Sequence, residues 1–205
     1  MKALLQVEVV MAMFLLAASS SWAQSSADLI ALFDAPCARY GVPKQLAVAV
    51  AAQESGGRPW ALNIARRSIF YASKEEALLA TEAALRSGTS FSIGVMQVNS
   101  WWLRRYNLPL ELVYEPRGNI QVGVWILAQA IKRYGLTWQA LAAYNTGSAD
   151  RYPESGRAYA EAVLARLHRY SQAVPSMSSS TPRQASPAGS PMVVYKRREV
   201  ASNEK

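Results

Sequence analysis

The chain has 205 residues, of which 51% are hydrophobic and 18% are charged, and it carries a formal net charge of +8. This composition excludes an intrinsically disordered chain and predicts one compact domain of ordinary size. The positive charge suits an acidic polymer, either nucleic acid or a cell wall that bears free carboxylates.

The N-terminal segment is typical of a secretory signal peptide. Lys2 precedes an apolar run over residues 9–18, and small residues follow as far as Ala23. The run is too short to span a bilayer permanently, which favours cleavage over an uncleaved anchor. We expect residues 1–23 to be removed, leaving a periplasmic protein without a membrane span, with Met11 as an alternative start.

Export argues against nucleic acid as the partner. The sequence contains no P-loop, no Cys/His spacing typical of a metal site and no RNA-binding motif, so we expect neither a metal nor a cofactor. Cys37 is the only cysteine, which excludes an intrachain disulfide. We interpret this residue as a small buried hydrophobe.

Residues 26–170 show helical spacing of apolar residues and no run of alternating β-branched residues, which predicts an all-α domain. The expected helices are a first one that carries Leu29, Ile30, Leu32 and Phe33 and ends at Gly41, and six others over residues 44–55, 73–88, 99–106, 116–135, 137–144 and 154–170.

Several of these helices have recognisable boundaries. Ser73 and Glu76 form a capping box, in which each side chain satisfies an end group of the other residue. Asn99 or Ser100 is expected to cap the short helix, and Pro116 to begin the long one. The long helix should be buried because it carries Val122, Trp125, Ile126, Leu127 and Ile131.

Beyond residue 173 the composition shifts to Ser, Pro, Thr and Gly, which bury too little apolar area to offset the entropy of ordering. This predicts a disordered tail over residues 173–205 and a compact domain over residues 24–172. A basic segment near the C-terminus is interpreted as a solvated charge run, with a docking peptide or a wall-contacting patch as alternatives.

Glu54 ends the most apolar of the predicted helices, after residues 46–53. Partial burial disfavours the charged carboxylate and raises its pKa, which keeps a glutamic acid protonated as a general acid near neutral pH. The alternative is an ordinary surface glutamate, although a carboxylate at a helix C-terminus is placed unfavourably against the helix dipole.

Four segments carry further chemistry. They are Glu54-Ser55, residues 92–99 (Ser-Ile-Gly-Val-Met-Gln-Val-Asn), residues 142–147 (Ala-Ala-Tyr-Asn-Thr-Gly) and residues 156–159 (Gly-Arg-Ala-Tyr). In this order they resemble the Glu-Ser, Gly-Leu-Met-Gln, Ala-Tyr-Asn-x-Gly and Arg-x-Tyr motifs of the soluble lytic transglycosylase family. One such motif alone would be a weak signal, whereas four in the right order are specific.

The resemblance extends over about residues 31–167 and implies a mainly α, lysozyme-like fold related to goose-type lysozyme. It implies that the chain cleaves peptidoglycan glycan strands, with Glu54 as acid and then base. The substrate's own N-acetyl group and C6 hydroxyl would complete the reaction and form a 1,6-anhydro ring, without metal or cofactor. Five further residues would lie in the substrate-binding cleft: Ser55, Gln97, Tyr144, Asn145 and Tyr159.

Most glycosidases place two carboxylates beside the scissile bond. Asp150 and Glu154 follow the third motif and are the acids that could approach the cleft, but we do not expect a second catalytic acid. Trp101 and Trp102 could stack on sugar rings, yet one of the pair is expected in the core and neither is assigned to the site.

Within the family, residues 138–147 and the helix over 73–88 are most similar to small members that accompany type III and type IV secretion, conjugation and pilus systems. Components of such machinery are therefore expected partners. Val95 replaces the usual Leu, and Arg117 stands where many of these members have a cysteine that could pair with Cys37. Two rival hypotheses are a hydrolytic muramidase and a non-catalytic glycan-binding scaffold.

Overall fold

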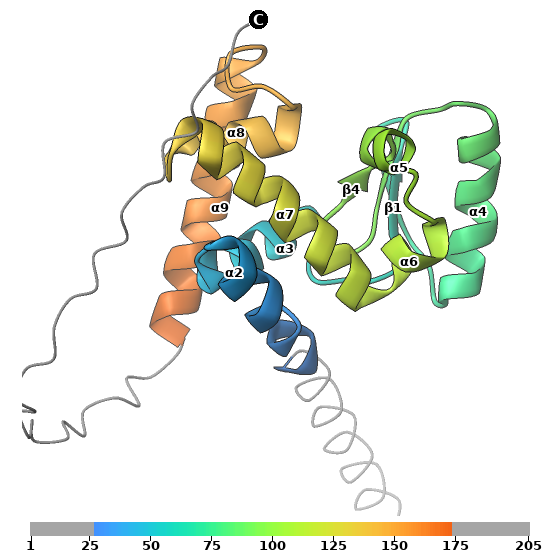
Figure 1. Ribbon diagram of the computed structural model, residues 1–205, viewed down its shortest axis with the longest axis horizontal. Coiled ribbons are helices and arrows are strands. Elements are labelled where there is room, and N and C mark those ends of the chain that lie inside the picture. Colours follow the sequence, from blue (N-terminus) through green and yellow to red (C-terminus); the bar gives the residue numbers. More distant parts are fainter. Residues whose placement is uncertain (1–26, 174–205) are drawn as a thin grey trace, which may run out of the picture. The chain divides into compact units, whose positions relative to one another are not determined.

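The computed structural model describes residues 27–173 (Figure 1). The predicted signal peptide and nearly all of the predicted tail lie outside the described residues. Within the described part, no helix is long and apolar enough to cross a membrane. The elements are α2 (Asp34–Tyr40), α3 (Lys44–Glu54), β1 (Ala61–Ile64), β2 (Arg67–Phe70), α4 (Lys74–Arg86), β3 (Phe91–Ile93), β4 (Val98–Asn99), α5 (Ser100–Tyr106), α6 (Leu110–Tyr114), α7 (Pro116–Tyr134), α8 (Trp138–Thr146) and α9 (Pro153–Ala173).

The prediction of a mainly α fold is confirmed, and the fold also contains short strands that the sequence pattern did not reveal. Four antiparallel strands form a sheet in the order β2-β1-β3-β4. The two longest have four residues each, β3 has three and β4 has two. Alternation of apolar and polar residues cannot be recognised over such short segments, and β2 is mostly exposed.

Helix α3 lies at the centre of the first of two hydrophobic cores. Its residues 46–51 are all buried, as the apolar sequence predicts. α9 packs against α3 and α8, and α7 packs against α2 and α8. Each fully buried leucine or valine contributes about 1.5–3 kcal/mol relative to an exposed one. The packing around α3 therefore holds the end of this helix, where Glu54 lies, in a defined place.

The second core joins the sheet to α4, α5 and α6. Leu62 of β1 pairs with Ile93 of β3, and both side chains are buried there. Tyr144 of α8 packs against both cores, so it lies where they meet.

Most predicted helix boundaries are confirmed. α3, α5 and α7 begin where expected, and Asn99 caps α5 by accepting a bond from the backbone N–H of Trp101 at 2.9 Å. In the capping box of α4, Ser73 accepts from the N–H of Glu76 at 3.2 Å. The Glu76 carboxylate accepts from the N–H of Ala72, one residue earlier than the capping box requires.

Some helix boundaries differ from the prediction, and one short helix was not predicted. Residues 27–31 and α2 are separate helical segments because Pro36 has no N–H to donate to the carbonyl of Leu32. Thr137 precedes α8 but donates its hydroxyl to the carbonyl of Tyr134 instead of capping, and α8 continues to Thr146. The five-residue helix α6 is too short to show a helical pattern of its own.

Candidate active site

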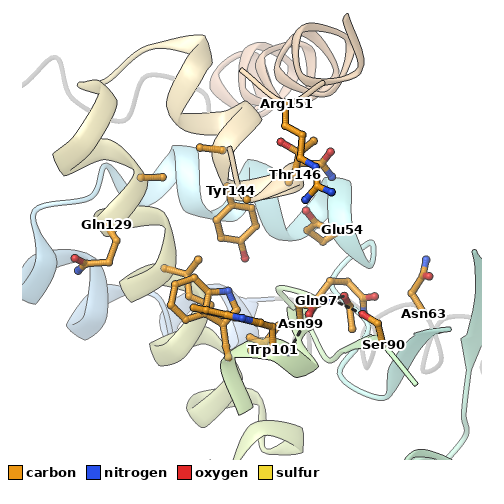
Figure 2. A pocket seen from close by; sticks show the side chains of 18 of the residues that line it. Glu54, Asn63, Ser90, Gln97, Asn99, Trp101, Gln129, Tyr144, Thr146 and Arg151 are labelled. Carbon is orange, nitrogen blue, oxygen red and sulfur yellow. Dashed lines mark hydrogen bonds between the residues drawn. The ribbon is translucent and has the colours of Figure 1, made fainter. Parts of the chain in front are cut away.

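A cleft of about 860 Å³ opens beside the end of α3. Its walls come from α3, the sheet, α5, α7 and α8. In Figure 2, Glu54 and Tyr144 project towards the wall that carries Gln97 and Trp101. Gln129 lies at the end of the cleft opposite Glu54. The lining includes Glu54, Gln97, Asn99, Trp101, Tyr144 and Asn145, together with Arg133 and Arg151.

Glu54 is the last residue of α3, and its side chain is partly buried. Burial raises the pKa of its carboxyl group to about 7, and a hydrogen bond from Tyr159 opposes part of that rise. The Tyr159 hydroxyl donates to Oε1 of Glu54 at 2.5 Å. At neutral pH a large fraction of Glu54 is therefore protonated, the state that a general acid needs.

Two tyrosines surround this carboxyl group. Burial and the neighbouring Glu54 charge raise the pKa of both Tyr144 and Tyr159 well above the usual range, so both remain neutral donors. Tyr144 donates to the backbone carbonyl of Met96 at 2.7 Å, whereas Tyr159 reaches Glu54 from α9 and is not among the cleft-lining residues.

Gln97 ends the turn that joins β3 to β4. Its Nε2 donates to the carbonyls of Gly94 at 2.9 Å and Ala61 at 3.3 Å. The φ of Gln97 is +47°, a left-handed conformation that costs a non-glycine residue about 1–3 kcal/mol. The strained backbone and the two bonds fix a polar side chain on the cleft wall, opposite Glu54 (Figure 2).

Asn119, which sequence reasoning did not assign to the site, holds the same turn from inside the protein. It is fully buried, accepts from the N–H of Met96 at 2.7 Å, and donates to the carbonyls of Ile93 and Val113 at 2.9 Å each. A Cβ on Gly94 would lie 2.0 Å from Nδ2 of Asn119. The available signal was an amide within a helix predicted to be buried, because a buried polar group needs partners.

Ser55 lies behind the cleft and does not line it. Its side chain is 3% exposed and its hydroxyl donates to the carbonyl of Val95 at 2.7 Å. The hydroxyl therefore ties the end of α3 to the β3–β4 turn, a positioning task in place of the expected substrate contact. Of the other predicted residues, Gln97, Tyr144 and Asn145 line the cleft together with Glu54.

Glu54 is the only acidic residue that lines the cleft within the described part of the chain. Asp150 and Glu154, the two acids that could have approached it, are exposed and lie outside the lining. No group of three or more His, Cys, Asp or Glu side chains in residues 27–173 could hold a metal ion.

Both tryptophans line the cleft, but they differ in burial. Trp101 is 53% exposed, whereas Trp102 is partly buried, packs against the second core and meets Trp125 edge to face at 5.4 Å. Cys37 is buried, as expected, and burial raises the pKa of its thiol to about 11.

Comparison with known proteins settles the family. A sequence model described as "Transglycosylase SLT domain" matches residues 31–163. The chain belongs to this family. The resemblance recognised from the four motifs is therefore confirmed. The lysozyme-like, mainly α architecture of this family agrees with the helices and small sheet described above.

Individual proteins are similar to parts of the chain. The chain is 40% identical to the X polypeptide of Escherichia coli over 81 residues, which are 37% of this chain and 48% of that protein, about half its length. It is 24% identical to Invasion protein IagB of Salmonella typhi over 75% of this chain and 81% of that protein. It is 25% identical to Protein IpgF of Shigella sonnei over 64% of this chain and 75% of that protein.

Proposed function

We propose that this SLT-domain chain cleaves the β-1,4 bond between MurNAc and GlcNAc in peptidoglycan without water and leaves a 1,6-anhydro-MurNAc end. The observation that carries the proposal is Glu54, a single partly buried carboxyl group with a pKa of about 7 at the wall of a cleft lined by polar and apolar side chains. The family match supplies the class of substrate.

The first step uses the proton on Glu54. The carboxyl group donates it to the glycosidic oxygen while the bond from that oxygen to the anomeric carbon breaks, and the substrate's N-acetyl oxygen bonds to the anomeric carbon. Tyr159 stabilises the carboxylate that remains, because it donates a hydrogen bond to Oε1. No second protein carboxylate is needed, which agrees with a lining in which Glu54 is the acid.

The second step returns the proton to Glu54. The carboxylate takes it from the C6 hydroxyl of the same muramic acid, whose oxygen then attacks the anomeric carbon and displaces the N-acetyl oxygen. The nucleophile is attached to the same sugar residue as the anomeric carbon, so its effective concentration is high. Gln97, Tyr144, Asn145 and the exposed face of Trp101 are the groups that we expect to hold the sugars.

Loss of the proton donor tests this role. Replacing Glu54→Gln should reduce the release of soluble fragments from purified sacculi at least about a thousandfold, because the amide cannot donate the proton in the first step. Glu75→Gln removes an exposed carboxylate from α4 and should leave the rate unchanged. Unchanged clearing by the Glu54→Gln variant would leave only the non-catalytic scaffold hypothesis.

We further propose that the protein acts in the periplasm, where it opens local gaps in the wall for a secretion or conjugation apparatus. Support comes from the motif resemblance to secretion-associated members and from a relative whose name is Invasion protein IagB. In the source bacterium, a Glu54→Gln allele should reduce secretion or conjugation through the apparatus it serves as strongly as deletion does. Full activity of that allele would contradict a wall-opening role.

A further inference from the structure

Positively charged side chains outnumber negatively charged ones in the cleft lining. Two arginines, Arg133 and Arg151, line it with Glu54, and no other charged residue does so in the described part of the chain. Near neutral pH much of Glu54 is uncharged. The cleft therefore presents a net positive lining to its ligand, although a glycan backbone of N-acetylated sugars is itself neutral.

Neither arginine is neutralised by the protein. The ion pairs within residues 27–173 join Lys44 to Asp34, Lys74 to Glu115 and Arg86 to Glu82. Arg133 and Arg151 take part in none of them, and both are exposed on the cleft walls. A guanidinium is a planar, permanently charged donor that suits a carboxylate, so both groups are available to an anionic ligand.

The two arginines come from different walls. Arg151 follows α8, and Figure 2 shows it with Thr146 on the Glu54 side of the cleft. Arg133 lies in the last turn of α7, four residues after Gln129, which Figure 2 places at the other end. Residues four apart share a helix face, so Arg133 extends the Gln129 face of the cleft.

Arg133 also has an aromatic neighbour in the cleft lining. Its guanidinium lies 5.1 Å from the centre of the Tyr134 ring, and Tyr134 lines the cleft. The hydroxyl of Tyr134 is itself buried, so the exposed charge of Arg133 is what this part of the lining presents to an anionic ligand.

We infer that Arg133 and Arg151 bind carboxylates carried by the lactyl substituents of muramic acid, and thereby select strands that bear such groups over neutral chitin-like glycan. This inference rests on the proposed function, because it assumes that a glycan strand occupies the cleft. The carboxylates come either from the attached peptides or from the lactyl group itself once the peptide has been removed.

Binding measurements in the Glu54→Gln background separate recognition from cleavage. The ligands are a peptide-bearing glycan oligomer, the same oligomer after amidase treatment, and chitohexaose, which carries no carboxylate. Replacing Arg133→Gln and Arg151→Gln together should weaken binding of the peptide-bearing oligomer about tenfold at low salt and leave chitohexaose binding unchanged. Lys132→Gln, beside Arg133 but outside the cleft lining, is the matched control and should change neither.

The arms of this experiment identify the source of the carboxylate. A loss confined to the peptide-bearing oligomer assigns the arginines to the peptide carboxylates, and a loss confined to the amidase-treated oligomer assigns them to the lactyl carboxylates that amidase exposes. A loss on both oligomers, with chitohexaose unchanged, assigns them to both kinds of carboxylate. Unchanged binding of both oligomers, or an equal loss on chitohexaose, would overturn the inference. Sacculus cleavage by the unmodified chain is scored separately, so failure of the proposed function is distinguished from failure of this selectivity.

Discussion

Glu54 has a carboxyl group whose ionisation is opposed by burial at the end of α3, with a pKa of about 7. The leaving sugar must receive a proton from Glu54 when the glycosidic bond breaks, so the cleavage rate follows the protonated fraction of Glu54. We predict that kcat/KM on sacculi is level below about pH 6 and falls about tenfold per pH unit above about pH 8. A rate that stays constant from pH 6 to pH 9 would contradict this role for Glu54.

Tyr159 opposes the effect of burial, because its hydrogen bond lowers the pKa of Glu54. Replacing Tyr159→Phe should move the basic limb of the pH profile to higher pH by up to about one unit, and should lower the maximal rate because the carboxylate loses its donor. Tyr114→Phe is the matched control. It removes a buried hydroxyl that bonds to Thr81 at 2.6 Å in the second core.

The control variant should lose stability without moving the pH profile. Equal pH profiles for the Tyr159→Phe variant and the unmodified chain would show that Tyr159 does not tune the pKa of Glu54.

At the residue scale, the sequence predicts the partial burial of Glu54, because the apolar helix that precedes it can be recognised in the chain. It cannot predict that Ser55 turns away from the cleft, since the partner of Ser55 is a carbonyl 40 residues away.

The β3–β4 turn is the element that places Gln97, and it depends on contact between Gly94 and Asn119. A Gly94→Ala variant should lose about 2–4 kcal/mol of unfolding free energy, because a new Cβ would clash with the fully buried amide as well as strain the backbone. Gly88→Ala tests strain alone, since Gly88 has a similar φ of +71° but nothing within 4 Å of an added Cβ.

Urea denaturation of both variants measures the difference. The Gly88→Ala variant should lose only about 1 kcal/mol, the ordinary cost of a side chain in the left-handed region. Equal losses for the two variants would mean that the contact with Asn119 does not determine the turn.

Prediction from sequence succeeds for elements with strong local signals. The apolar run of α3, the cap at Asn99 and the proline that begins α7 are all visible in the chain. Prediction from sequence fails for the sheet, because β4 has only two residues and its pairing with β3 depends on the turn between them. The buried amide of Asn119 likewise becomes interpretable only when three backbone groups from separate elements surround it.

The described domain as a whole forms one cleft from distant segments. The end of α3, the β3–β4 turn and α8 contribute Glu54, Gln97 and Tyr144, which are 43 and 47 residues apart in turn along the sequence (97 − 54 and 144 − 97). The two hydrophobic cores meet at Tyr144, so substitutions that loosen either core are expected to alter the width of this cleft. The motifs correctly predict Glu54, Gln97, Tyr144 and Asn145 in the lining, but the arginines on the cleft walls belong to no motif.

The fate of the anomeric carbon tests the central claim most directly. Sacculi digested by the chain in water enriched in ¹⁸O are analysed by mass spectrometry of the released muropeptides. The mechanism through Glu54 predicts 1,6-anhydro-MurNAc ends without ¹⁸O. The contrary result is a digest without anhydro ends, in which the MurNAc residues have reducing ends that took up ¹⁸O during cleavage. This result would contradict the mechanism and would identify a hydrolytic muramidase.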